Sequence, residues 1–191
     1  MNKKVTVFDF DKTLTDKDTL FGFYRTVAGN DRFFYIKRFL LLVAGVFYKT
    51  GLINNSTLKR VGISLFLKGK SFEELEVAAR QYANKIELNN VYITHYLNSD
   101  DEKWIVSASP EIYLKYVFPG ENVVGTTLRY HSGKVRGLEV NMFGQEKKRF
   151  LIDKGIGKIS EFFTDSLTDK PLMDISEKVY IINQGHIYQT K

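Results

Sequence analysis

The sequence contains no cysteine, and its three histidines (His95, His131 and His186) lie far apart in the chain. Without cysteine the protein can form neither a disulfide nor a zinc–thiolate site, and it cannot use a thiol nucleophile. The histidines lack the spacing of metal ligands, so we expect each to be a surface or structural residue. The sequence also has no internal repeat and no low-complexity tract.

An apolar leader is missing as well, because the four N-terminal residues run directly into a predicted strand. This start predicts a cytoplasmic protein. Of the 191 residues, 43% are hydrophobic and 26% are charged. A chain of this size and composition can build one substantial domain with an insertion, or two small domains.

Acidic residues are nearly absent between positions 20 and 70, which contain nine lysines and arginines and a single acidic residue, Asp31. This segment carries a charge of +8 in a chain whose net charge is +6. Such a block indicates either an anionic partner or a solvated helix face. We expect no nucleic acid partner, because no recognised binding motif accompanies the basic residues.

An unusually apolar run, residues 39–48, has ten residues without charge and is flanked by Lys37, Arg38 and Lys49. A helix that spans a bilayer needs about 20 apolar residues, so this run is too short. The simplest interpretation is a buried helix. The alternative is an interfacial helix, with apolar side chains on one side and basic residues at its borders.

The order of patterns along the chain predicts an α/β fold with a parallel sheet and right-handed crossovers. A strand over residues 5–8 is followed by a helical block from 18 to 86, with helix starts at Asn54 and Ser71. After residue 103, strands and helices alternate. The predicted later elements are strands at 104–106, 123–130, 134–140, 159–163 and 179–182, and helices at 111–117, 146–154 and 169–174.

Four short segments carry chemical groups at predicted strand ends or helix starts. In order, they supply a carboxylate pair, a hydroxyl, an ammonium group and a second carboxylate pair. This inventory suits Mg²⁺ binding and phosphoryl transfer. Taken singly, each segment could be an ordinary turn or helix cap. The order of all four segments along the chain is what indicates a phosphoryl-transfer site. The residues are Asp9 and Asp11, Ser107, Lys147, and Asp165 and Asp169.

Each group has a predicted role. Asp9 attacks phosphorus, and Asp11 acts as general acid and then as general base. Asp165 is the third protein donor to Mg²⁺, and Asp169 supports it or holds a metal-bound water. Ser107 and Lys147 contact the phosphoryl oxygens. Lys148 is an alternative to Lys147 for this contact.

Residues 9–15 resemble motif I of the haloacid dehalogenase superfamily, and Ser107, Lys147 and the Asp165/Asp169 pair match its later motifs. The resemblance implies a Rossmann-like core (1–17 and 88–191) with a helical cap (18–87) inserted between the first and second core strands. It implies Mg²⁺ held by Asp9, by the backbone carbonyl of Asp11 and by Asp165. The chain departs from the family at two positions where glycine is common, Lys12 and Thr164.

Within the superfamily the chain is most similar to the phosphoserine phosphatase branch. That likeness implies Asp18 and Arg60 as substrate-binding residues, with Thr13 and Ala108 beside Ser107 at the phosphate. The Ser-Ala-Ser-Pro segment at 107–110 departs from the Ser-Gly-Gly of that branch.

The basic, aromatic cap resembles the phosphatidylglycerophosphatase C family instead. This implies an anionic or amphiphilic phosphomonoester as substrate, such as phosphatidylglycerophosphate. It also implies peripheral contact with the inner face of an anionic membrane, which attracts basic residues by about 1 kcal/mol each. A soluble metabolite phosphatase is the alternative, and a phosphotransferase or a binding protein on the same fold is a third.

Overall fold

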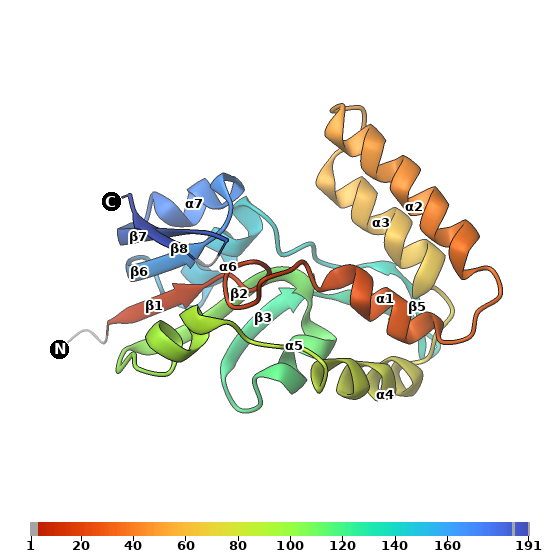
Figure 1. Cartoon of the computed structure of the whole chain (residues 1–191), viewed down its shortest axis with the longest axis horizontal. Coiled ribbons are helices and arrows are strands. Elements are labelled where there is room, and N and C mark those ends of the chain that lie inside the picture. The colour runs from red at the N-terminus through yellow and green to blue at the C-terminus, as the bar shows by residue number, and fades with distance from the viewer. Residues whose placement is uncertain (1–3, 185, 191) are drawn as a thin grey trace.

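The computed structural model describes residues 4–184 and 186–190. Figure 1 shows a sheet with flanking helices and, at one end of it, a group of helices that projects beyond the sheet. Residues 1–3, which belong to the start on which the cytoplasmic prediction rests, lie outside the described residues.

The central sheet has six strands in the order β3-β2-β1-β6-β7-β8. Neighbouring strands run parallel except for β8, which pairs with β7 in the antiparallel direction and was not predicted. The predicted α/β fold with a parallel sheet is therefore confirmed. The strands are β1 (Val5–Phe8), β2 (Glu102–Pro110), β3 (Asn122–Thr126), β6 (Ile159–Thr164), β7 (Ser176–Asn183) and β8 (His186–Gln189).

Both faces of the sheet are covered, as β1 illustrates. Val5 and Val7 point into one apolar cluster and Phe8 points into another, because side chains alternate along a strand. A strand buried on both faces needs an uninterrupted run of β-branched and aromatic residues, which this segment supplies. The covering helices are η1 (Tyr92–Tyr96), α5 (Glu111–Val117), α6 (Gln145–Asp153), η2 (Leu167–Asp169) and α7 (Lys170–Met173).

Four of the helices between β1 and β2 form the cap. Their starts follow local rules: the Asn54 side chain accepts a hydrogen bond from the Thr57 amide, and Ser71 and Glu74 form a capping box. Both predicted helix starts are thus confirmed. The helices are α1 (Leu20–Ala28), α2 (Phe34–Lys49), α3 (Asn55–Phe66) and α4 (Phe72–Ala83).

The prediction of one continuous strand over residues 123–130 is wrong, because strand β3 ends at Thr126. The Thr126 hydroxyl donates to the carbonyl of Ala108 (2.6 Å) and accepts from the amide of Met142 (3.2 Å), which ties this point to neighbouring segments. Beyond it the chain leaves the sheet and forms a separate hairpin of β4 (Leu128–His131) and β5 (Lys134–Leu138).

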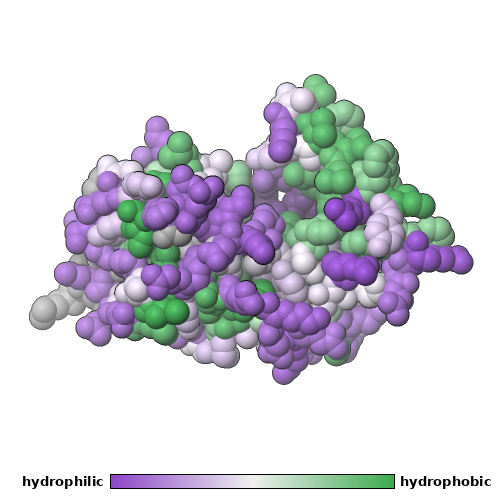
Figure 2. All heavy atoms as spheres, in the orientation of Figure 1, coloured by the Kyte–Doolittle hydropathy of each residue, from purple (hydrophilic) through white to green (hydrophobic). Residues whose placement is uncertain are grey.

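Helix α2 is exposed along most of its length, so the interpretation of residues 39–48 as a buried helix is also wrong. Phe34 and Ala44 are its buried residues, whereas Phe39 is 64% exposed and Leu42 is 60% exposed. Figure 2 shows the resulting hydrophobic surface on the projecting helices. In the described part of the chain, no helix is both long enough and apolar enough to cross a bilayer.

Candidate active site

A cavity of about 670 Å³ lies where the core meets the cap. Its core side is formed largely by residues at or just beyond the carboxyl ends of β1, β2 and β6, the edge where ligands bind in open α/β sheets. Its cap side is formed by α1, α2 and α3. The predicted residues that line it are Asp9, Asp11, Asp18, Ser107, Ala108, Lys147, Asp165 and Asp169.

Lys147 stands at the centre of the buried charges. Its Nζ donates to Asp9 Oδ1 and to Asp169 Oδ2, each at 2.8 Å, and all three side chains are buried. The hydroxyl of Thr164 also donates to Asp169 Oδ2 (3.0 Å). Lys148 is on the same helix but does not line the cavity, so the structure brings Lys147 to the carboxylates.

The charges in this group shift one another. Burial raises the pKa of Asp9 to about 7, although Lys147 opposes the shift. Burial by itself would lower the pKa of Lys147, but the carboxylates of Asp9 and Asp169 outweigh it and raise that pKa. The lysine is therefore held as a cation.

Three hydrogen-bond donors from two residues hold the Asp11 carboxylate. Its Oδ1 accepts from the amide (2.7 Å) and the hydroxyl (2.6 Å) of Thr19, and its Oδ2 accepts from the hydroxyl of Ser109. Burial, followed by the nearby charge of Asp18, raises the pKa of Asp11 to about 6, while Ser109 and Thr19 lower it. A carboxyl group with a pKa near neutrality suits both proton donation and proton acceptance.

Thr19 connects Asp11 to the cap, a role that no motif indicated. Its hydroxyl lies 2.7 Å from that of Tyr113, and its carbonyl accepts from the hydroxyl of Tyr82 (2.6 Å). Thr19 directly precedes α1, so a residue at the start of the cap orients the proposed acid. The only sequence signal was a hydroxyl residue just before a helix, which typically indicates a cap.

Lys59 is the second functional side chain that the sequence reasoning missed. It comes from α3 of the cap, is buried, and donates to the Ala108 carbonyl (2.5 Å), Thr126 Oγ1 (3.1 Å) and Asn141 Oδ1 (2.6 Å). Burial, with the charge of Lys147, lowers the pKa of Lys59 to about 7. The basic block contained it, but nothing distinguished it from its neighbours.

Of the other predicted residues Asp18, Arg60 and Thr13, one lines the cavity and two do not. Asp18 lines the cavity, but its Oδ1 also accepts from the Leu20 amide (3.0 Å) at the start of α1. Arg60 is exposed and does not line the cavity; its neighbour Lys59 does. Thr13 is fully buried and also does not line the cavity. Neither Arg60 nor Thr13 therefore lines the cavity with the other site residues.

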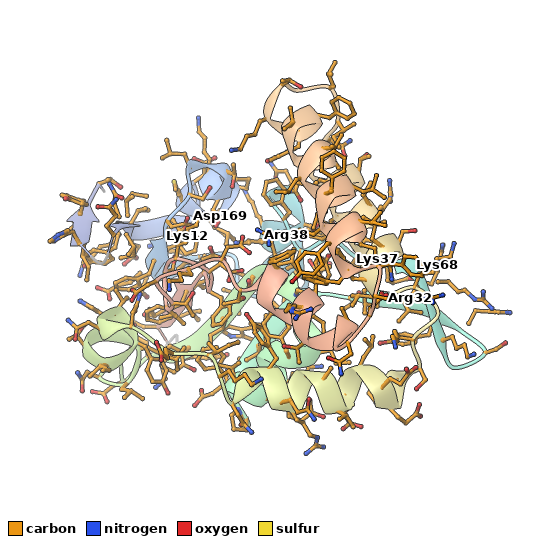
Figure 3. All side chains as sticks on the ribbon, turned by 45° about the vertical axis from the view of Figure 1, so that its right-hand side comes forward. Lys12, Arg32, Lys37, Arg38, Lys68 and Asp169 are labelled. Atoms are coloured by element: carbon orange, nitrogen blue, oxygen red, sulfur yellow. The ribbon has the colours of Figure 1, made fainter. Side chains whose placement is uncertain are left out.

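The two departures from the family pattern are both accommodated. Lys12 has a φ of 58°, a left-handed conformation that favours glycine, and its amide donates to the hydroxyl of Thr15 (3.2 Å). Its charge lowers the pKa of Asp165, whose burial acts in the opposite and larger sense. Thr164 replaces glycine with a hydroxyl that supports Asp169. Figure 3 labels both Lys12 and Asp169 on the core.

The residues fit Mg²⁺ by their chemistry. Asp9 and Asp165 line one cavity, and carboxylate and carbonyl oxygens are the ligands that Mg²⁺ prefers. Burial raises the pKa of both carboxyl groups, so added positive charge would favour their ionised forms. Among the described residues, no three His, Asp or Glu side chains already form a metal cluster. The predicted set needs only two side chains and a backbone carbonyl.

Known proteins resemble the chain over nearly its whole length. Protein CicA of Caulobacter vibrioides (strain NA1000 / CB15N) is 28% identical over 197 residues, which cover 95% of this chain and 87% of that protein. A protein of unknown function from Bordetella pertussis Tohama I has a TM-score of 0.74 at 18% identity, covering 91% of this chain and 87% of that one. A phosphoserine phosphatase, solved as an analogue of its phospho-aspartyl intermediate, has a TM-score of 0.60 at 19% identity, covering 94% and 86%.

The solved structures share the fold of this chain. The pattern of the haloacid dehalogenase-like hydrolases itself matches residues 6–174, from β1 through η2 and α7. This span contains every cavity-lining residue named above. The chain therefore belongs to the haloacid dehalogenase-like hydrolase family, as its four motifs predicted.

Proposed function

We propose that the protein is a Mg²⁺-dependent phosphatase that hydrolyses an amphiphilic, anionic phosphomonoester, such as phosphatidylglycerophosphate, through an aspartyl-phosphate intermediate. One observation carries the proposal. A single cavity has the four motif carboxylates at its core end and the apolar side chains of α2 at its cap end. A molecule with a phosphate head and an apolar tail matches both ends.

In the first step a carboxylate oxygen of Asp9 forms a bond to phosphorus while the ester P–O bond breaks. Asp11 donates its proton to the departing alcohol oxygen, and the Asp11 carboxylate then accepts a proton from water as that water attacks the phosphorus. The bond between Asp9 and phosphorus breaks, and inorganic phosphate leaves.

Lys147 keeps Asp9 in position and offsets the negative charge that the phosphate brings. Mg²⁺, held by Asp9, Asp165 and the Asp11 carbonyl, would supply further positive charge at the phosphoryl oxygens. Ser107 is buried at the end of β2 and lines the same cavity, where it can contact those oxygens.

The apolar cap end of the cavity supports an amphiphilic substrate. Residues from three cap helices line it, and most of their side chains are aliphatic or aromatic, the charged exceptions being Lys49 of α2 and Lys59 of α3. A tail placed there would leave water, which stabilises binding by about 25 cal/mol for each Å² buried. These residues are Phe21 of α1, Leu41, Leu42 and Val46 of α2, and Leu58 of α3.

A small soluble substrate of the phosphoserine type is the second candidate. Asp18 favours it, because this carboxylate lines the cavity and could meet an ammonium group. Arg60 weighs against it. The carboxylate of such a substrate would need a basic partner inside the cavity, and Arg60 does not line the cavity.

A substrate panel tests the proposal. Phosphate release would be measured with Mg²⁺ for an aryl phosphate, for O-phosphoserine and for phosphatidylglycerophosphate in mixed micelles. We expect hydrolysis of all competent substrates to require Mg²⁺ and the lipid phosphate to give the highest kcat/KM. A preference for O-phosphoserine would support the second candidate, and no Mg²⁺-dependent release from any ester would refute the phosphatase itself.

A further inference from the structure

Helix α2 has an apolar outer face that the rest of the described residues leave exposed. At about 100° per residue, its exposed apolar side chains fall within an arc of roughly 160°. Opposite this arc lies the inner face, where Phe34 and Ala44 are buried and Leu41 packs partly against the main apolar cluster. A helix that is apolar all round is normally buried on every side. The exposed residues are Tyr35, Ile36, Phe39, Leu40, Leu42, Val46 and Phe47.

Basic residues gather at one end of this face. Arg32, Lys37 and Arg38 lie at the N-terminal end of α2, together with Lys68, as Figure 3 shows. The guanidinium groups of Arg32 and Arg38 lie over the rings of Phe33 and Phe21, 4.8 Å and 5.6 Å from the centroids, so they stay next to apolar surface.

The charge favours a lipid bilayer over the other occupants of such a face. A second copy of this chain would bring two segments of +8 together, since residues 20–70 contain nine basic residues and one acidic residue. Like charges facing each other oppose association. A nucleic acid would match the charge but would leave the apolar arc exposed to water. An anionic bilayer matches both, because it has an apolar interior beneath a negative surface.

The outer face is continuous with the cavity. Leu42 and Val46 are 60% and 57% exposed, yet they also line the cavity that contains Asp9. Helix α2 thus forms a wall with the active site on one side and the apolar arc on the other, and these two side chains lie where the sides meet.

We propose that α2 is a membrane-docking helix that lies in the interface of an anionic bilayer and places the mouth of the cavity at the lipid surface. The docking stands independently of the reaction, whereas the delivery of a lipid phosphomonoester to the cavity rests on the proposed function. Docking requires no bilayer span and no partner protein.

Sedimentation of the full-length protein with vesicles tests the docking. We expect the protein to sediment with vesicles of phosphatidylcholine mixed with phosphatidylglycerol at low salt. It should not sediment with phosphatidylcholine alone. Binding should fall as the ionic strength rises, because the attraction decays over a Debye length of about 10 Å at 0.1 M salt.

Two pairs of variants separate the apolar and basic contributions. Ile36→Ser with Phe39→Ser should weaken vesicle binding by at least about tenfold, because the two side chains would enter the bilayer. The matched control is Val77→Ser with Ile93→Ser, since Val77 and Ile93 are 56% exposed on other helices. This control should bind like the unmodified protein.

Charge removal is tested in the same assay. Arg32→Gln with Arg38→Gln should weaken binding at low salt by about fivefold for each charge. Lys154→Gln with Lys158→Gln, which changes two exposed lysines of the core, should not. The docking is overturned by any of three results: no sedimentation at low salt, equal binding to neutral vesicles, or binding that the Ile36/Phe39 change leaves intact.

Light scattering without vesicles tests the competing occupant. If the chain forms a dimer that the Ile36/Phe39 change dissociates, α2 is an interface between copies and the proposal is wrong. We expect light scattering at low salt to give the same molar mass for the unmodified protein and for the variant.

Activity then separates this inference from the proposed function. The Ile36/Phe39 variant should hydrolyse an aryl phosphate normally, because neither side chain lines the cavity. Its rate on phosphatidylglycerophosphate in anionic vesicles should fall by at least about tenfold, in proportion to binding. Aryl phosphatase activity without vesicle binding would refute the docking alone. Vesicle binding without any phosphatase activity would refute the proposed function alone.

Discussion

The two ends of the cavity are built in opposite ways. At the core end, Asp9, Lys147 and Asp169 come from separate segments and are fixed to one another at 2.8 Å. At the cap end, the lining comes largely from α2, a helix with an exposed outer face whose buried residues are Phe34 and Ala44. One end is a closed network of charges and the other is a partly exposed apolar wall.

This difference assigns chemistry and selectivity to different parts of the chain. The charged end tolerates little change, because removal of one partner leaves a buried charge unpaired. The apolar end has no such network, so a change there alters which tail fits without disturbing the reacting groups. We therefore expect large, substrate-independent effects at the core end and smaller, substrate-dependent effects at the cap end.

The largest effect is expected for Asp9→Asn. Asparagine has nearly the same shape but is a poor nucleophile, so turnover of an aryl phosphate should fall by at least about 10³-fold. Steady-state kinetics with Mg²⁺ measures the loss. Asp153→Asn, on the outside of α6, is the matched control and should retain activity. Turnover by a carefully purified Asp9→Asn protein at the unmodified rate would contradict the covalent mechanism.

The next effect is expected for Asp11→Asn, which removes the proton donor but keeps the backbone carbonyl. Turnover should fall by about 10²–10⁴-fold, the usual contribution of general acid–base catalysis. Calorimetry should show nearly unchanged Mg²⁺ affinity, because the metal is expected to contact only the carbonyl of this residue. A variant that lost Mg²⁺ affinity yet turned over normally at saturating metal would reverse this division of roles.

The same contrast between the two ends explains what the sequence could predict. The site residues stand in short segments at strand ends or, like Lys147, near a helix start, and the sheet edge brings these ends together. Asp9, Asp11, Ser107 and Lys147 could therefore be placed in one cavity before the structure was known. The α/β order was predictable for the same reason, since alternating strands and helices leave few topologies.

The support of the site was not predictable, because it depends on how the cap packs. Thr19 reaches Asp11 only after α1 has docked, and Lys59 rather than Arg60 faces the core because of the rotation of α3. The exposure of α2 could not be read from its sequence either. An apolar run looks the same whether its outer face meets protein or water.

Asp11→Asn should also change stability in the metal-free protein. The pKa of Asp11 rises from 3.8 to about 6 in the folded state. The folded state therefore holds a proton between these values that the unfolded chain has lost, and its stability falls as the pH rises through this window. Asparagine does not ionise, so the variant does not lose this stability as the pH rises.

At pH values above this window, the Asp11→Asn protein should be more stable than the unmodified protein by at most about 3 kcal/mol. Below pH 3.8 the difference should disappear. Urea unfolding in the presence of a chelator measures it at both ends of the range. A variant that is less stable at every pH would show that the Asp11 hydrogen bonds outweigh its buried charge.

A smaller effect is expected for Ser109→Ala, which removes one donor to Asp11. This hydrogen bond lowers the pKa of Asp11, so its loss should raise that pKa further. The alkaline limb of the pH–rate profile should move upward accordingly. Ser109→Thr keeps a hydroxyl and should restore the original limb. A fall in rate with no movement of the profile would assign Ser109 a purely structural role.

The smallest effect is expected at the apolar end, for Leu42→Ala. Leu42 lines the cavity, and losing part of one apolar contact typically changes discrimination between substrates by about tenfold. The ratio of kcat/KM for a long-chain lipid phosphate to that for a short-chain one should therefore fall by about this factor. The change should reside in KM, because Leu42 is remote from the proton and phosphoryl transfers in the proposed mechanism. Val77→Ala, an exposed change on α4, should leave the ratio unaltered. If Leu42→Ala instead lowered kcat for both chain lengths equally, the apolar wall would act on the chemistry, and the division between the two ends of the cavity would fail.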